Sequence, residues 1–262
     1  MTTEGLIGPA QLKDSYRRVL DRIETAATGA GRRANDVQMI AVTKYATPDQ
    51  IRTLVEMGHA ELGESKVQQL SQRVAMLEEF LGRKKTLAGA APRSSVDDLP
   101  EKVRWHMVGH LQRNKVKQIV PLVGLIHSVD SLRLAEEIHN YAARLDTVVD
   151  ILIQVNATGE TTKTGVAGPA VIHLADQIDT MMHLRLRGLM TMGPNTDNPE
   201  DARAGFARTA DIFADMRKEK VGGPECNVLS MGMSSDLEVA VEEGANVLRI
   251  GKALFGEPPV QA

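Results

Sequence analysis

The sequence has 262 residues, 42% of them hydrophobic, and a formal net charge of −3. A chain of this size can bury one substantial core, and it has no basic excess with which to neutralise a nucleic acid backbone. Its one cysteine excludes an intrachain disulfide, the opening residues are too polar for a signal peptide, and no apolar run is long enough to span a bilayer. We therefore expect a single cytoplasmic domain, residues 1–262, that binds neither nucleic acid nor membrane.

Short apolar, β-branched runs alternate along the chain with amphipathic segments. Residues 9–28 are expected to form a first helix. The predicted strands follow at 37–44, 60–65, 104–111, 124–130, 150–156, 184–192, 227–233 and 246–256. Helical patterns fill four of the intervals, at 47–59, 131–145, 169–183 and 198–220. In the first of these, Thr47 is the expected N-cap, Pro48 the first helical residue and Gly58 the C-terminal stop.

This alternation favours a parallel sheet covered by helices. About eight such units close into a barrel, so the predicted fold is α/β, a single (β/α)8 TIM-type barrel at about residues 37–256 with an additional N-terminal helix. Residues 82–100 are expected to form a mobile surface loop. Barrels of this type carry their active sites at the carboxyl ends of the strands.

Lys44 ends the first predicted strand and therefore lies at that end of the barrel. Two interpretations remain open from its position alone. It could be a surface lysine that keeps its ammonium in water, or a lysine that forms a Schiff base with an aldehyde. The second role requires a free amine, and hence a pKa lowered from the ordinary value of about 10.4.

A predicted anion site follows the last two strands. Ser235 and Glu238 have the spacing of a capping box, which would begin a helix there and direct free backbone N–H groups toward the barrel mouth. Ser234 adds a hydroxyl donor, and Gly251 allows backbone to approach a ligand closely. The bland alternative is that the serines only cap a helix and that Gly251 only packs.

Histidines and basic residues offer weaker signals. His106 and His110 are four residues apart, but on a strand that spacing spans about 13 Å, too far for both to bind one zinc ion. We expect no metal site. Arg113 and Lys115 belong to a small basic cluster that is best interpreted as a solvated helix start.

Several motifs occur in an order that resembles a known family. They are "AVTK", "GES" followed by "VQQ", "WHMVGHLQRNK", "IHSVDS", "LIQVN" with Glu and then "KTG" after it, "RGLMTM", "LSMGMSSDLEVAV" and "RIGKALFG". From about residue 37 to 256 the chain is similar to the pyridoxal phosphate homeostasis proteins, or YggS/PROSC family, which are related to the N-terminal barrel of alanine racemase. The resemblance implies pyridoxal 5′-phosphate as cofactor.

The resemblance also assigns roles to residues. It implies a Schiff base on Lys44, phosphate contacts from Ser234, Ser235 and the backbone at Gly251, and an arginine, Arg249, facing the pyridine nitrogen. In one place this chain departs from the family pattern. Ser65 and Lys66 stand where the family usually has Asn and Tyr, so this chain lacks the side chain of that asparagine.

Arg249 bears on the activity to be expected. A guanidinium only donates, so a ring nitrogen facing it must be an unprotonated acceptor and the ring a weaker electron sink. The chain ends shortly after its last predicted strand, and we expect no second domain of the kind that completes alanine racemase. The expected function is a monomeric carrier without catalytic residues that holds the cofactor for vitamin B6 homeostasis and passes it to apo-enzymes. The alternative is a pyridoxal phosphate-dependent amino-acid racemase.

Overall fold

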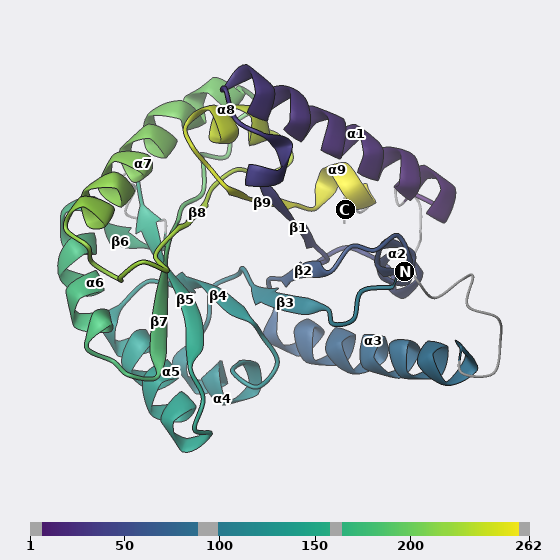
Figure 1. The fold of residues 1–262 in the computed structure, drawn as a ribbon, viewed down its shortest axis with the longest axis horizontal. Coiled ribbons are helices and arrows are strands. Elements are labelled where there is room, and N and C mark those ends of the chain that lie inside the picture. Colours follow the sequence, from purple (N-terminus) through teal and green to yellow (C-terminus); the bar gives the residue numbers. More distant parts are fainter. Residues whose placement is uncertain (1–6, 89–98, 158–163, 257–262) are drawn as a thin grey trace, which may run out of the picture.

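In the computed structural model, which describes residues 7–88, 99–157 and 164–256, the last predicted strand is wrong at its end, because Lys252–Phe255 are helical. Strands are otherwise present at all eight predicted positions. They are β1 (Gln38–Val42), β2 (Glu61–Glu64), β3 (Arg104–Met107), β4 (Leu125–Val129), β5 (Val149–Asn156), β7 (Leu184–Met190), β8 (Val228–Ser230) and β9 (Val247–Ile250). Neighbouring strands pair in parallel, and the β1–β9 and β4–β5 pairings close the ring. The predicted barrel is therefore confirmed (Figure 1).

Helices surround this ring on its outer side (Figure 1). They are α2 (Pro48–Glu56), α3 (Val67–Ala88), α4 (Val116–Ile119), α5 (Leu132–Arg144), α6 (Val171–Asp179), α7 (Arg203–Lys218), α8 (Leu237–Glu242) and α9 (Lys252–Phe255). Short 3-10 turns occur at Ala34–Asp36, Arg113–Lys115, Gly168–Ala170 and Pro199–Ala202, and a two-residue strand, β6 (Val166–Ala167), pairs with the end of β5. The four predicted helices correspond to α2, α5, α6 and α7.

Strand side chains alternate between the interior of the barrel and the helical layer, as the two-residue period of a strand requires. On β1, Met39 and Ala41 belong to the large apolar core under the helices, whereas Ile40 and Val42 do not. The interior is partly polar. His127 of β4 reaches Ser230 of β8, two strands that are not neighbours, so these side chains meet inside the ring.

The first helix, α1 (Pro9–Gly29), packs against α8, α9 and α2. Figure 1 shows it alongside α8 and α9 at the edge of the ring. Because α9 has only four residues, α1 covers the stretch that a longer final helix would cover. Its buried residues Leu12 and Ile23 supply the apolar contact. The predicted additional helix is confirmed, and it completes the helical layer.

The ends of α2 test the predicted roles of Thr47, Pro48 and Gly58. The Thr47 hydroxyl accepts from Gln50 N at 3.2 Å, and the Gln50 side chain accepts from Thr47 N at 2.8 Å. Pro48 begins α2, and Gly58 follows its end with φ +87°. All three boundary predictions are confirmed.

The predicted surface loop at 82–100 is partly wrong. Residues 82–88 continue α3, which the sequence did not suggest because a glycine and two lysines break its apolar pattern. Residues 89–98 lie outside the described residues. Within the described ranges, no helix combines the length and the apolar character that crossing a membrane requires.

Candidate functional site

Lys44 lies in the turn after β1, at the carboxyl end of the barrel. Ala46 N donates to Thr43 O at 2.8 Å and closes this turn. The Lys44 side chain is exposed, with Nζ 4.8 Å from the centroid of the Tyr45 ring. Such a contact contributes about 0.5–1 kcal/mol at an exposed site, so a ligand that binds the amine more strongly can replace it.

A buried ion pair holds this turn from below. Arg73 of α3 contacts the Glu64 carboxylate and also donates to Thr43 Oγ1 at 3.0 Å and to Ala46 O at 3.1 Å. Glu64 is fully buried at the end of β2. Burial lowers the pKa of Arg73 to about 10, so the guanidinium remains charged at neutral pH. The residues on either side of Lys44 are thus tied to the sheet and to α3.

The loops after β8 and β9 meet beside the end of β1. The Ser234 hydroxyl accepts from Ala253 N at 3.1 Å. At Gly251, an added Cβ would lie 3.1 Å from Val42 O, a spacing that favours glycine. Val42 is two residues before Lys44, so three of the predicted site residues are brought to one end of the barrel.

The predicted capping box at Ser235 and Glu238 is wrong. Helix α8 begins at Leu237 with Asp236 as its N-cap residue and no side-chain cap hydrogen bond. Asp236 instead accepts from Met233 N at 2.5 Å. Glu238 pairs with Arg22 of α1 at 2.7 Å. Because Glu238 forms this ion pair with Arg22, its side chain does not complete a local capping box. Ser235 is exposed.

Arg249 is buried inside the barrel, two residues before Gly251 on β9. Its Nη1 donates to Ser230 Oγ at 2.7 Å and its Nη2 to Thr191 O at 2.8 Å. Burial lowers the pKa of Arg249 to about 10, and the nearby Asp236 carboxylate opposes the shift. Its direct partners among the described residues are a neutral hydroxyl and a neutral carbonyl, which hold a charged guanidinium in a fixed plane.

The polar partners of Arg249 were missed at the level of sequence. Ser230 also lies 3.1 Å from His127 Nδ1, and His127 Nε2 lies 3.0 Å from His106 Nδ1. His110, in contrast, is half exposed, with Nδ1 3.2 Å from Asp130 Oδ2. Counting alternate residues on each strand could have placed Ser230 and Arg249 on the interior face, but not the contact between β4 and β8.

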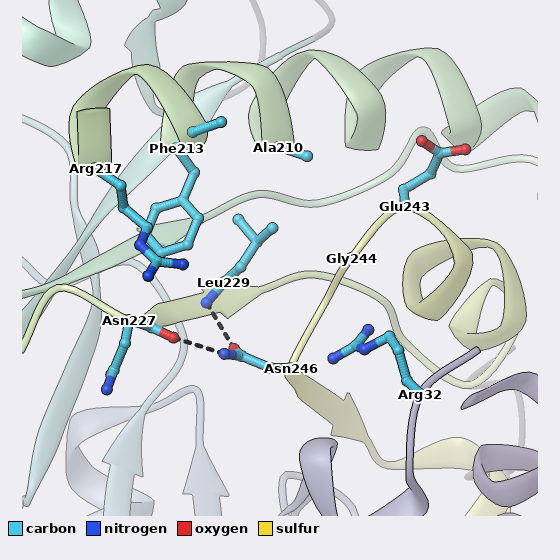
Figure 2. Close-up of a pocket in the computed structure, with 10 residues that line it drawn as sticks. Arg32, Ala210, Phe213, Arg217, Asn227, Leu229, Glu243, Gly244 and Asn246 are labelled. Carbon is cyan, nitrogen blue, oxygen red and sulfur yellow. Dashed lines mark hydrogen bonds between the residues drawn. The ribbon is translucent and has the colours of Figure 1, made fainter. Parts of the chain in front are cut away.

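A separate cavity of about 320 Å³ lies at the other end of the barrel (Figure 2). It is lined by Asn227 and Leu229 at the start of β8, by Asn246 before β9, and by Phe213 and Arg217 of α7. Leu229 N donates to Asn246 Oδ1 at 2.7 Å across its floor. Because Asn227 and Asn246 precede β8 and β9, the cavity lies at the amino-terminal ends of these strands and is distinct from the predicted site. Among the described residues, no cluster of His, Cys, Asp and Glu could hold a metal ion.

Comparison with known proteins defines the class first. The family model described as "Alanine racemase, N-terminal domain" matches residues 20–259. The pyridoxal phosphate homeostasis protein of Aquifex aeolicus is 37% identical over 241 residues, which cover 92% of this chain and 95% of that protein. The chain therefore belongs to the pyridoxal phosphate homeostasis proteins within the alanine racemase N-terminal domain family, and the resemblance found in the sequence is confirmed.

Solved structures agree with this assignment. An unknown protein from Bifidobacterium adolescentis superposes with a TM-score of 0.81 at 32% identity, covering 97% of this chain and 99% of that chain. PipY of Synechococcus elongatus, solved with PLP bound, superposes with a TM-score of 0.69 at 29% identity, covering 84% of this chain and 93% of that chain.

Proposed function

We propose that this chain binds pyridoxal 5′-phosphate at the carboxyl end of its barrel and takes part in vitamin B6 homeostasis without efficient catalysis. The main support is the convergence of Lys44, Ser234 and Gly251 beside the buried guanidinium of Arg249. The name of the Aquifex relative and the PLP in the PipY structure support the same ligand.

The side chains in this region suit the parts of that cofactor. When bound, pyridoxal phosphate supplies an aldehyde, with which the exposed Lys44 amine can condense, releasing water. Ser234 accepts from Ala253 N and keeps its own proton for a phosphate oxygen. At Gly251 the missing side chain leaves its backbone open to a ligand. Ser235, exposed in the same loop, is proposed to contribute a second phosphate contact.

Arg249 supports a carrier over a racemase. With a pKa of about 10 it is charged at neutral pH, and toward a ligand that faces it the guanidinium can only donate hydrogen bonds. A ring nitrogen facing it stays unprotonated, which makes the ring a weak acceptor of electrons from the substrate. Transamination is thereby disfavoured, and racemisation would in addition need an acid–base group on the opposite face. We propose a cytoplasmic monomer that passes its cofactor to apo-enzymes.

The proposal is tested by locating the bound cofactor. The full chain is incubated with pyridoxal phosphate, its visible absorption is recorded, and borohydride reduction is followed by peptide mapping. We expect the label on Lys44. A label found chiefly on Lys66 or Lys252 would contradict the proposed site.

A second experiment separates the carrier from the racemase. The loaded protein is incubated with L-alanine and other amino acids in heavy water, and deuterium at the α-carbon is measured beside reactivation of a pyridoxal phosphate-dependent apo-enzyme. General acid–base help contributes typically 10²–10⁴-fold, so we expect slow exchange together with reactivation. Exchange at about 1 s⁻¹ or faster would favour the racemase.

A further inference from the structure

A network of hydrogen-bonded side chains crosses the interior of the barrel from Glu61 to Arg249. Glu61 Oε2 lies 2.5 Å from His106 Nε2, and His106 Nδ1 lies 3.0 Å from His127 Nε2. His127 Nδ1 lies 3.1 Å from Ser230 Oγ, which accepts from Arg249 Nη1 at 2.7 Å. Both histidines, the serine and the arginine are buried, whereas 22% of the Glu61 side chain is exposed. We call these five residues the interior network.

The two ends of the interior network have opposite charges. Burial alone would raise the pKa of Glu61, but its hydrogen bond with His106 and the nearby charge of Arg104 lower it overall, so Glu61 is ionised at neutral pH. A carboxylate only accepts hydrogen bonds, and the guanidinium of Arg249 only donates them. Burial also lowers the pKa of His106 and of His127, which keeps both rings neutral between these charged ends.

These roles give the interior network one direction. His106 must present an N–H at Nε2, because a lone pair there would face the carboxylate as a second acceptor. Its Nδ1 is then an acceptor and receives the hydrogen bond that His127 Nε2–H donates. His127 Nδ1 accepts in turn from the Ser230 hydroxyl. Every link has one donor and one acceptor, and both histidines are fixed as the Nε2–H tautomer.

The Arg249 end alone would not fix this direction. The Ser230 oxygen has two lone pairs, so it can accept from Arg249 and from His127 at the same time. In that reversed arrangement His127 Nδ1 donates to Ser230. The serine oxygen then accepts from two donors, and its hydrogen bond with Arg249 is weaker. Glu61 is therefore the residue that selects the arrangement in which the serine oxygen accepts a hydrogen bond from Arg249 alone.

Other charged groups face the interior network. Arg104 lies near Glu61 and both histidines, and its charge favours the ionised carboxylate and the neutral rings. His59 also lies near Glu61, and its own pKa is lowered by burial. Asp236 faces Arg249 from the loop after β8. Arg104 therefore favours an ionised Glu61 and neutral histidine rings, and Asp236 favours a charged Arg249.

We propose that Glu61 is a positioning residue for Arg249. Acting through the interior network, its charge at the amino-terminal end of β2 fixes the guanidinium that faces the cofactor site at the opposite end of the barrel. The inference rests on the proposed function where it concerns the cofactor, while the hydrogen-bond direction is a property of the protein alone.

The test uses the full chain, first without cofactor. Nitrogen-15 spectra of the imidazoles should show the Nε2–H tautomer at His106 and His127. In Glu61→Gln, whose amide can donate as well as accept, the second tautomer should appear. Proton exchange of the Arg249 guanidinium should become about tenfold faster, as expected when a hydrogen bond to a charged group is weakened. Ser230→Ala should speed this exchange at least as much.

Glu225→Gln is the matched control, since Glu225 pairs with Arg185 at 3.0 Å and has no link to the interior network. It should leave tautomers and exchange unchanged. After loading with pyridoxal phosphate, the visible absorption maximum should shift in Glu61→Gln and not in Glu225→Gln. A wild-type Nδ1–H tautomer, or unchanged tautomers and exchange in Glu61→Gln, would overturn the proposal. Failure to bind pyridoxal phosphate would instead contradict the proposed function and leave the cofactor-free measurements valid.

Discussion

The two ends of the barrel differ in how their charged side chains are used. At the amino-terminal end, Asp150 accepts from Arg104 at 3.2 Å and from Arg187 at 3.0 Å. Arg185 lies 3.0 Å from Glu225 in the same region. Opposite charges are paired there, and the pairs of Asp150 link β3, β5 and β7.

At the carboxyl end, the ion pair of Glu64 and Arg73 lies near Lys44 and Ser234, whose printed contacts among the described residues are not ion pairs. In the part of the chain that the structure describes, the Lys44 ammonium contacts an aromatic ring, and Ser234 has a hydroxyl proton to donate. The buried pair of Glu64 and Arg73 lies just beneath and holds the turn in place. One end is thus built of ion pairs that stabilise the barrel, and the other contains the residues for which we propose a role in ligand binding.

The largest effect should come from Lys44→Ala. The variant should lose the absorption of bound pyridoxal phosphate and fail to retain it through gel filtration, since the amine that condenses with the aldehyde is gone. Its free energy of unfolding without cofactor should change by less than about 0.5 kcal/mol, because the side chain is exposed. Lys66→Ala, an exposed lysine at the same end of the barrel, is the control and should bind normally. Full retention of pyridoxal phosphate by Lys44→Ala would contradict the proposed ligand-binding role of the carboxyl end.

Arg73→Ala should give the largest loss of stability. Removing one partner of a buried ion pair costs about 3–5 kcal/mol, because the fully buried Glu64 carboxylate would lose its counter-charge. Arg83→Ala, on the same helix with an exposed partner in Glu79, should change stability by less than about 1 kcal/mol. Urea denaturation of both variants measures the difference. Equal effects would show that the turn at Lys44 does not depend on the buried pair.

The sequence predicted the fold well because its signals are local. Strand runs, the Thr47 cap and the stop at Gly58 depend on neighbouring residues and on the burial of apolar side chains. Helix α3 was not among the predicted helices, and its last residues fall in the predicted loop, because a helix can continue over residues whose pattern is not apolar when its earlier turns are packed.

After Lys44→Ala, the next largest loss of cofactor binding should come from Ser234→Ala. Loss of a hydrogen bond to a charged phosphate costs about 1.5–3 kcal/mol, which raises Kd by about tenfold to a hundredfold. Stability without cofactor should fall by at most about 1.5 kcal/mol, since Ala253 N loses its acceptor. Titration followed by absorption gives Kd, with Ser71→Ala on α3 as the control. An unchanged Kd would mean that phosphate is bound elsewhere.

The candidate site was only partly accessible to sequence reasoning. Lys44, Ser234, Gly251 and Arg249 follow from strand ends and family motifs, and their roles toward the cofactor remain predictions. Glu64 could not be paired with Arg73 in advance, because the contact depends on how α3 lies against the sheet. Long-range side-chain pairs of this kind are set by packing, which a local pattern does not contain.

Acid should destabilise the barrel through its buried histidines. Burial lowers the pKa of His127 below the ordinary value of about 6.5, so the unfolded chain takes up its proton at higher pH than the folded chain does. Stability is then full above about pH 6.5 and falls as the pH drops below it, by up to about 1.4 kcal/mol per pH unit for each such histidine. His127→Gln should reduce this slope, measured by denaturation between about pH 5 and 7. His173→Gln, at an exposed histidine, should not reduce it.

The smallest effect on stability is expected for Ser235→Ala. Ser235 is exposed and makes no cap, because α8 begins at Leu237 and Glu238 is engaged by Arg22. The free energy of unfolding should therefore change by less than about 0.5 kcal/mol. Asp236→Ala is the contrast within the same loop, since its buried carboxylate accepts from Met233 N, and leaving that donor unsatisfied costs about 1–3 kcal/mol. If Ser235→Ala were as destabilising as Asp236→Ala, the hydroxyl would cap the helix in solution after all. If it leaves stability unchanged but weakens pyridoxal phosphate binding, its role belongs to the ligand, as for the other groups at the carboxyl end.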